Sequence, residues 1–306
     1  RLGAERTGQG QDANPCTHCL TLRGLADFFF VHPLGQTAFN VDQLQAEFVE
    51  DVLVIAAALD DGADRAFQAV LGGNHVAGLA DRGFFVQAAL VLQLELVDLP
   101  LGKVLYESGG SLSHVYFPTN AIVSLLYVLE SGASAEIAVV GFEGMVGISI
   151  FMGGESMPTS TEVQSAGQAF RLSRKVMQNE FGLGGHLQAL SLLFTQAMIS
   201  QTAQNAVCNQ HHELDQQMCR WLLMSIDRLD GCELAITQER VAKLLGVRRE
   251  SVTQTLGLLE KEGLIERSRG LITVVKRSKM EKRVCECYGV VKDEYDRLLP
   301  ARKRRN

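Results

Sequence analysis

The sequence lacks any apolar run that approaches the roughly 18 residues needed for a membrane-spanning helix. Its longest candidate, Val52 to Leu59, has acidic residues on both sides and is typical of a buried element. The chain starts at Arg1 rather than Met, and the residues that follow lack the basic, apolar and small-residue order of a secretory signal. We therefore expect a cytoplasmic protein that does not bind membranes.

Cysteine is scarce and unevenly spread, with 7 cysteines in 306 residues. An odd number at such spacing excludes the dense framework of a small disulfide-bonded protein, so we expect reduced thiols. Cys16 and Cys19 form a C-x-x-C pair, but no further Cys precedes Cys208, and an iron–sulfur cluster needs four thiolates. His114 and His186 are candidate haem ligands, although no other feature selects haem.

Two further groups contain metal-ligating residue types. The first comprises Cys208, His211, His212 and Cys219. Its spacing fits no zinc template, so ordinary helix packing is the favoured interpretation. The second group is Cys285 and Cys287, whose side chains would diverge by about 200° if both lay on a helix. We therefore predict no metal and no other cofactor.

Catalytic motifs are lacking as well. GFEGMVG spaces its glycines as G-x-x-G-x-x-G, which is neither a P-loop nor a dinucleotide fingerprint. The sequence has no nucleophile elbow, no H-E-x-x-H motif and no distinct pair of catalytic carboxylates. We expect no enzymatic activity.

The charge distribution divides the chain into an acidic body and a basic end. Residues 208–306 contain 20 Lys and Arg against 15 Asp and Glu, whereas residues 1–207 contain 9 against 20. A basic C-terminal third fits a module that binds a polyanion, although a solvated charged face gives similar counts. The length favours at least two domains, and 46% hydrophobic residues suffice for a buried core.

Short β-type runs dominate the middle of the sequence. LELVDL, HVYF, AIVSLLYVL, EIAVV and EVQSAG follow one another between about Leu92 and Leu172, with Gly or Pro at many of the breaks. This spacing favours a sandwich or barrel-like domain, which we place at residues 74–182. Residues 1–73 are rich in Gly and Ala and contain no motif, and we expect much of this segment to be a poorly ordered extension.

A long helix is predicted after the β domain. From His186 to Cys208, apolar and small residues recur at a 3-4-3-4 spacing, which places them on one face of a helix of about six turns. This face, with its neighbours, contains Leu187, Leu190, Phe194, Ala197, Met198 and Gln201. A helix of this length between two domains is typical of dimers, so we predict a dimerisation helix at residues 183–209. Packing of this face on its own domain is the alternative.

The basic third, residues 210–306, contains a helix-turn-helix pattern. In TQERVAKLLGVRRESVTQTLGLLEKEGLI, Thr237 fits an N-cap and Gly246 ends the first helix. The apolar face of the second helix contains Val252, Leu256 and Leu259. LIERSRGLITVV then predicts a β-hairpin with residues 268–270 at its tip. Two short helices followed by such a wing are typical of DNA-binding domains.

The outward face of the second predicted helix carries groups that recognise base edges. Arg can donate two hydrogen bonds to guanine, Glu can accept from cytosine, and Gln can pair with adenine. Arg at the wing tip is placed to meet phosphate. The predicted DNA-contacting residues are Thr237, Arg248, Arg249, Glu250, Ser251, Thr253, Gln254, Ser268 and Arg269.

These residues resemble the Crp/Fnr family of bacterial regulators, whose recognition helix carries an Arg-Glu-Ser/Thr-Val run, present here as Arg249 to Val252. LPLGKVLYESG, HVYFP and AEIAVVGFEGMVG are similar to that family's β-roll. The resemblance covers about residues 74–300. It implies an α+β fold with an N-terminal double-stranded β-helix (a jelly roll of the cyclic-nucleotide-binding type), a long dimerisation helix and a C-terminal winged helix-turn-helix. Several members have a second Arg at the place of Gln254, so we do not carry over the family's operator sequences.

The resemblance also implies where an effector would bind. Cyclic-nucleotide members use a Gly-Glu loop followed by an Arg-Ser pair, whose Arg meets the cyclic phosphate. The candidate effector pocket here comprises Glu143, Gly144, Thr159 and Ser160. No Arg or Lys occurs between Gly141 and Gln168, and a buried phosphate without a cation loses its strongest contact. We therefore do not expect cAMP as the effector.

The sequence thus predicts a homodimer that binds double-stranded DNA at a palindromic operator and regulates transcription together with RNA polymerase. Its effector would be an unidentified small molecule or a redox signal. The alternative is a redox- or metal-responsive sensor whose DNA binding is secondary, based on Gln254 and the seven cysteines.

Overall fold

The computed structural model describes residues 93–299. The predicted extension at residues 1–73, the Cys16–Cys19 pair and the first part of the predicted β domain lie outside the described residues. Within the described range, no helix is both long and apolar enough to cross a membrane.

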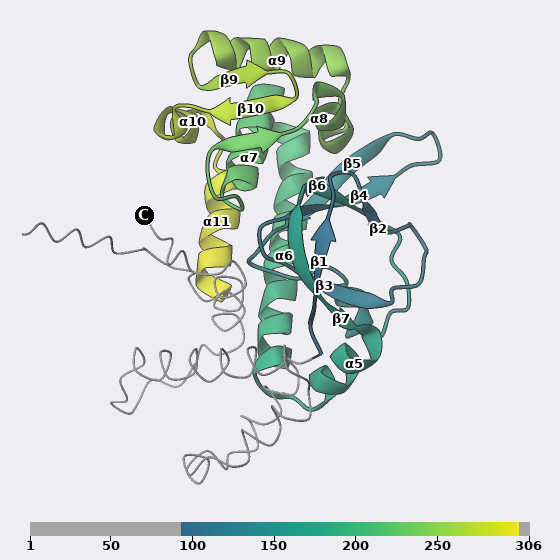
Figure 1. Cartoon of the computed structure of the whole chain (residues 1–306). Helices are drawn as coiled ribbons and strands as arrows, with labels where there is room; N and C mark the ends of the chain where they lie inside the picture. The colour runs from purple at the N-terminus through teal and green to yellow at the C-terminus, as the bar shows by residue number, and fades with distance from the viewer. Residues whose placement is uncertain (1–92, 300–306) are drawn as a thin grey trace, which may run out of the picture. The chain divides into compact units, whose positions relative to one another are not determined.

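The first half of the described chain forms two antiparallel sheets (Figure 1). The three-stranded sheet has the order β1 (Glu95–Leu99), β7 (Gly167–Ser173), β3 (His114–Pro118). The four-stranded sheet has the order β2 (Val104–Tyr106), β6 (Ser160–Ser165), β4 (Ile122–Val128), β5 (Ser134–Val140). A short 3-10 helix, η2 (Ile148–Ile150), lies between β5 and β6. The prediction of a β domain in this region is confirmed.

Both sheets contribute apolar side chains to the core. Val115 of β3 pairs with Leu172 of β7, and Val123 of β4 pairs with Val163 of β6. All four residues are buried. Burial of paired β-branched and aliphatic residues on both sheets removes their apolar surface from water, which stabilises the double-layered β domain.

Three helices follow the β domain: α5 (Arg174–Gly182), α6 (Gly185–His211) and α7 (Leu214–Ile226). The long helix expected from about His186 to Cys208 is α6, which has 27 residues. Helix α6 packs against β5 of its own chain, where the side chain of Gln201 accepts a hydrogen bond from the backbone N–H of Val139 and donates one to the Val139 carbonyl.

The face of α6 that we assigned to a dimer interface is covered by the chain itself. Its residues Leu187, Leu190, Phe194, Ala197, Met198 and Gln201 are all buried in the monomer. Phe194, for example, lies so close to Gly144 that a Cβ added there would be 2.0 Å from the ring. The dimer assignment of these residues is therefore wrong, and the alternative, packing on the same chain, is what the structure has.

The C-terminal half contains the predicted helix-turn-helix and its wing. Strand β8 (Glu233–Ala235) precedes helices α8 (Gln238–Leu245) and α9 (Arg249–Lys261), and β9 (Ile265–Ser268) and β10 (Leu271–Val274) form the hairpin. The three strands pair in the order β8-β10-β9. The two helices and the wing are confirmed, whereas β8 was not predicted.

Two helices close the described chain: α10 (Arg277–Arg283) and α11 (Cys287–Leu298). Helix α11 runs beside α6 (Figure 1), and Gln201 of α6 donates a hydrogen bond to the Tyr295 hydroxyl of α11 at 2.7 Å. Cys285 lies in the turn between α10 and α11. The assumption that Cys285 and Cys287 lie on one helix and diverge is therefore wrong.

Candidate DNA-binding interface

The helix-turn-helix is built by local signals at its ends. The Thr237 side chain accepts a hydrogen bond from the backbone N–H of Arg240 at 3.3 Å, which caps α8. Gly246 ends α8 with φ of 66°, a left-handed conformation in which glycine avoids the strain of a side chain. Val241 of α8 and Val252 of α9 are buried, so the two helices meet through their apolar faces.

The opposite face of α9 carries the predicted base-reading groups. Arg249, Glu250, Thr253 and Gln254 are exposed, and Ser251 is partly buried. Arg248 precedes the helix and is exposed as well. These polar groups are in the first two turns of α9, which is the part of a recognition helix that reaches base edges in the major groove.

The wing lies next to this helix. Ser268 and Arg269 are exposed at the tip of the β9–β10 hairpin, where Gly270 has φ of 75°. One surface hollow is lined by Thr237, Arg249, Ser268 and Arg269 among other residues, so residues from three separate elements share one concave surface. A concave surface that joins the start of the recognition helix to the wing is suited to a DNA backbone and groove edge.

Charge pairing separates the cations of this surface from the other arginines of the domain. Arg267 pairs with Glu260 at 2.5 Å, and Arg283 pairs with Asp215 at 2.7 Å. By contrast, no acidic partner of Arg248, Arg249 or Arg269 occurs within the described range. Their guanidinium groups remain available for bases and phosphates, which is the arrangement that polyanion binding needs.

Gln238 belongs to this surface and was missed in the sequence. Its Oε1 lies 2.7 Å from the Thr253 hydroxyl, which is also 3.0 Å from the carbonyl of Arg249. Gln238 thus connects the first turn of α8 to the exposed face of α9. Its position directly after the N-cap is a usable signal, because that position lies near the recognition helix in a helix-turn-helix.

The candidate effector residues are engaged within the chain. The Glu143 carboxylate accepts a hydrogen bond from Arg228 at 2.6 Å and another from the backbone N–H of Gly141 at 3.2 Å. Gly144 is in contact with Phe194. Thr159 and Ser160 are buried at the start of β6. Glu143 is therefore bound to a protein cation, in the place where the resemblance implies a ligand.

A buried hydrogen-bond chain links the β domain to α7. Ser124 Oγ lies 2.5 Å from Oε2 of Glu136 and 2.9 Å from Oε1 of Gln164. Gln164 Nε2 donates to Ser225 Oγ of α7 at 3.0 Å. Burial raises the pKa of Glu136 to about 7, so its neutral form is favoured near neutral pH.

A second polar contact joins the β domain to the helix-turn-helix itself. Glu162 of β6 forms ion pairs with Arg240 at 2.5 Å and with Lys243 at 2.8 Å, and both cations belong to α8. The Ser134 hydroxyl of β5 also donates to the carbonyl of Lys243 at 3.3 Å. Helix α8 is thus held against the four-stranded sheet.

Comparisons with known proteins agree with this geometry. Residues 216–283 match a family model described as a Crp-like helix-turn-helix domain. The chain is similar to the crystal structure of a Crp/Fnr-family transcriptional regulator from Eubacterium rectale, with 16% identity, a TM-score of 0.54, and coverage of 68% of this chain and 96% of that one. None of the curated protein sequences compared with the chain matches it.

Two further solved structures share the fold. FixK2 from Bradyrhizobium japonicum is 14% identical with a TM-score of 0.53, covering 63% of this chain and 98% of that one. A CRP-family transcriptional regulator from Thermus thermophilus is 17% identical with a TM-score of 0.53, covering 61% and 95%. The chain therefore carries a Crp-like helix-turn-helix domain and has the fold of the Crp/Fnr transcriptional regulators.

Proposed function

We propose that this chain is a sequence-specific transcriptional regulator that reads a two-fold symmetric operator as a homodimer. The observation that carries the proposal is the exposed row of polar groups on α9, flanked by Arg269 of the wing. Arg249, Glu250 and Gln254 offer the donors and acceptors that distinguish base pairs in the major groove. Half-sites about one helical turn apart would suit a dimer of such domains.

The free face of α6 supports a dimer. Leu192 and Ile199 are 52% and 62% exposed, and the exposed Ala203 and Ala206 follow at spacings of 4 and 3 residues along the same side of the helix. This stripe is on the side of α6 opposite Phe194, which is buried against the β domain. A second copy of the chain, packed helix to helix, would cover the exposed apolar side chains.

The effector is proposed not to be a cyclic nucleotide. Glu143 of the candidate effector pocket is bound to Arg228, and the segment from Gly141 to Gln168 contains no cation for a phosphate. We propose a regulator rather than an enzyme, acting in the cytoplasm at promoters where RNA polymerase is the partner. A calorimetric titration of cAMP that gave micromolar binding to the full chain would contradict the part of this proposal that concerns the effector.

The DNA proposal is tested by selecting binding sites from random duplexes and measuring affinities of alanine variants. We expect a palindromic site, and Arg249→Ala should lose about 1–3 kcal/mol of discrimination at one base step. Arg269→Ala should weaken binding to all duplexes alike and lower the salt dependence by about one ion. Lys175→Ala, which removes an exposed cation of α5, is the matched control and should bind as the wild type does.

The selection has a clear negative outcome. Equal affinity for all duplexes at physiological salt would contradict sequence-specific regulation. Loss of specificity in Lys175→Ala to the same degree as in Arg249→Ala would contradict the assignment of α9 as the reading element.

A further inference from the structure

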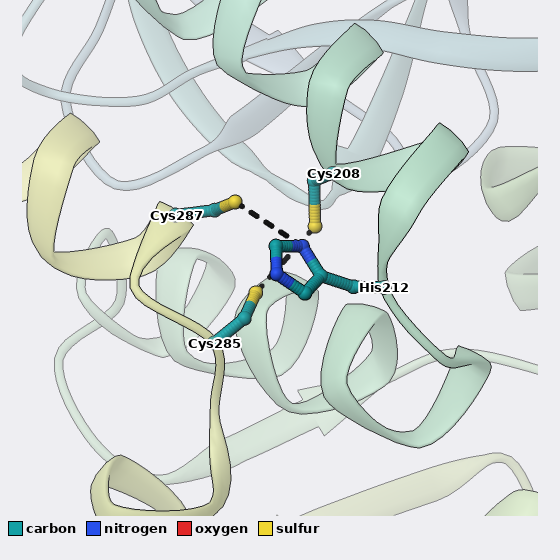
Figure 2. A group of neighbouring side chains, drawn as sticks. All are labelled: Cys208, His212, Cys285 and Cys287. Atoms are coloured by element: carbon teal, nitrogen blue, oxygen red, sulfur yellow. Dashed lines mark hydrogen bonds between the residues drawn. The ribbon is translucent and has the colours of Figure 1, made fainter.

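Four potential metal ligands from distant parts of the chain meet at one point (Figure 2). They are Cys208, His212, Cys285 and Cys287, whose ligand atoms all lie within 4.8 Å of one another. We propose that these residues form a mononuclear, structural zinc site. This inference is independent of the proposed function, because it rests on residues outside the DNA-binding surface.

Two of the distances between ligand atoms match those around a single ion, and all of them are within 4.8 Å. Cys208 Sγ lies 3.6 Å from Cys285 Sγ, and Cys287 Sγ lies 3.4 Å from His212 Nδ1. Around a tetrahedral zinc ion, with bonds of about 2.3 Å to sulfur and 2.0 Å to nitrogen, neighbouring ligand atoms are about 3.5–3.8 Å apart. An iron–sulfur cluster would place its ligands on different iron atoms and thus farther apart than one ion does.

The chemistry of the ligand set also selects zinc. Three thiolates and one imidazole form one of the closed tetrahedral sets that bind structural zinc. The three cysteines are 0–4% exposed, so all four positions around the ion would be filled by the protein and no open position would remain for a substrate. When zinc binds, each cysteine gives up its proton to solvent, and the ion is held by three thiolates and a neutral imidazole.

The surrounding residues orient these ligands. His212 faces Cys287 with Nδ1, and its other ring nitrogen, Nε2, lies 3.3 Å from the Glu286 carboxylate. A carboxylate on the second nitrogen of a metal-bound histidine fixes the ring and makes it a better ligand. Gln204 Nε2 donates a hydrogen bond to Cys287 Sγ at 3.0 Å, which helps to hold that side chain in place.

A buried cation balances the charge of the site. Zinc with three thiolates and a neutral histidine has one net negative charge, which is costly to bury without a partner. Arg220 of α7 is buried, and its positive charge acts electrostatically at Cys208, where burial alone disfavours a thiolate. The positive charge that the site needs is thus already present next to it.

The two helices connected by the site explain what the ion would do. Cys208 belongs to the last turn of α6 and His212 follows that helix, whereas Cys285 precedes α11 and Cys287 begins it. Figure 2 shows the four side chains pointing toward one another from these two segments. The ion would fix the start of α11 to the end of α6.

The test is the zinc content of the full-length protein, purified under reducing conditions and measured by elemental analysis. We expect one zinc per chain in the wild type. The zinc content of the variants Cys208→Ser and Cys285→Ser should fall to a small fraction of that value. Cys232→Ser is the matched control, because Cys232 is exposed and outside the cluster, and it should keep its zinc.

Two further measurements guard against variants that fail to fold. Cobalt(II) added to metal-free wild-type protein should give the absorption bands of a tetrahedral thiolate site. Glu286→Gln, which leaves all four ligands in place, should lower zinc affinity by about tenfold or more in a competition with a chelator. Unchanged affinity in this variant would contradict the role of Glu286 as the orienting partner.

Several results would overturn the zinc site itself. The first is a zinc-free wild-type protein that does not bind added cobalt or zinc at micromolar concentration. The second is stoichiometric iron in place of zinc. The third is a disulfide between Cys208 and Cys285 in the protein purified under reducing conditions. Because none of these measurements involves DNA, their failure would leave the proposed function untouched.

Discussion

Raising the pH from 5 to 8 should weaken the fold through one buried carboxyl group, Glu136. Burial raises the pKa of Glu136 to about 7, although Ser124 and the positive charges of Arg220 and Arg228 act in the opposite direction. The hydrogen bonds also favour a protonated Glu136. Both Glu136 and Gln164 present an oxygen to Ser124, and the single hydroxyl proton of Ser124 cannot be donated to both. A protonated Glu136 can donate to Ser124, and Ser124 can then donate to Gln164.

The magnitude follows from the difference in pKa between the native and unfolded chains. A carboxyl group with a pKa of 4.5 in the unfolded chain and about 7 in the native state changes the free energy of unfolding by about 3 kcal/mol. Its pKa is raised on folding, so the native state binds the proton more tightly. The stabilising contribution is fully present below pH 4.5 and is lost as the pH rises through 7.

The assay is denaturant unfolding at a series of pH values, followed by fluorescence of Trp221, the single tryptophan, which is buried in α7. Glu136→Gln keeps a donor for Ser124 without the charge, so it should be about 3 kcal/mol more stable than the wild type at pH 8 and similar at pH 5. Glu130→Gln, at an exposed carboxylate, should follow the wild type. Parallel stability curves for Glu136→Gln and the wild type would refute the reasoning.

Three other perturbations test separate contacts. Gly144→Ala places a Cβ 2.0 Å from the Phe194 ring and should lower the free energy of unfolding by about 1–3 kcal/mol. Thermal melts measure this loss, and adding Phe194→Leu to the same chain should partly reverse it. Ile199→Glu, which puts a charge on the exposed face of α6, should convert dimers into folded monomers in sedimentation experiments, and an unchanged sedimentation coefficient would rule out this face as the interface. Glu162→Gln removes the ion pair with Arg240 and should speed hydrogen exchange of α8 amides, and equal exchange rates would indicate that the contact does not hold α8.

Local signals in the sequence predicted the winged helix-turn-helix well. The cap at Thr237, the left-handed Gly246 and the hairpin tip at Arg269 each depend on a few neighbouring residues, so they could be inferred without the rest of the fold. Strand β8 has three residues and pairs with residues of β10 that lie 36 to 40 positions later, so its sequence carries little periodic signal.

Features that depend on tertiary contacts could not be inferred in the same way. Helix α6 is apolar on two opposite sides, and the spacing of Phe194 and Ile199 does not say which side meets its own domain. The metal-ligand cluster joins Cys208 to Cys285, 77 positions apart, so no compact spacing motif marks it. The raised pKa of Glu136 likewise arises from burial between elements that are distant in sequence.

The return of α11 to α6 has a mechanical consequence for the DNA-binding unit. The chain leaves α6 at His211 to form the winged helix-turn-helix, and it comes back beside α6 in α11. The winged helix-turn-helix is therefore connected to the rest of the chain at two places, the end of α6 and helix α11, rather than through one flexible linker. This double connection restricts rotation about a single hinge. For the winged helix-turn-helix to change its orientation, both connections must rearrange together.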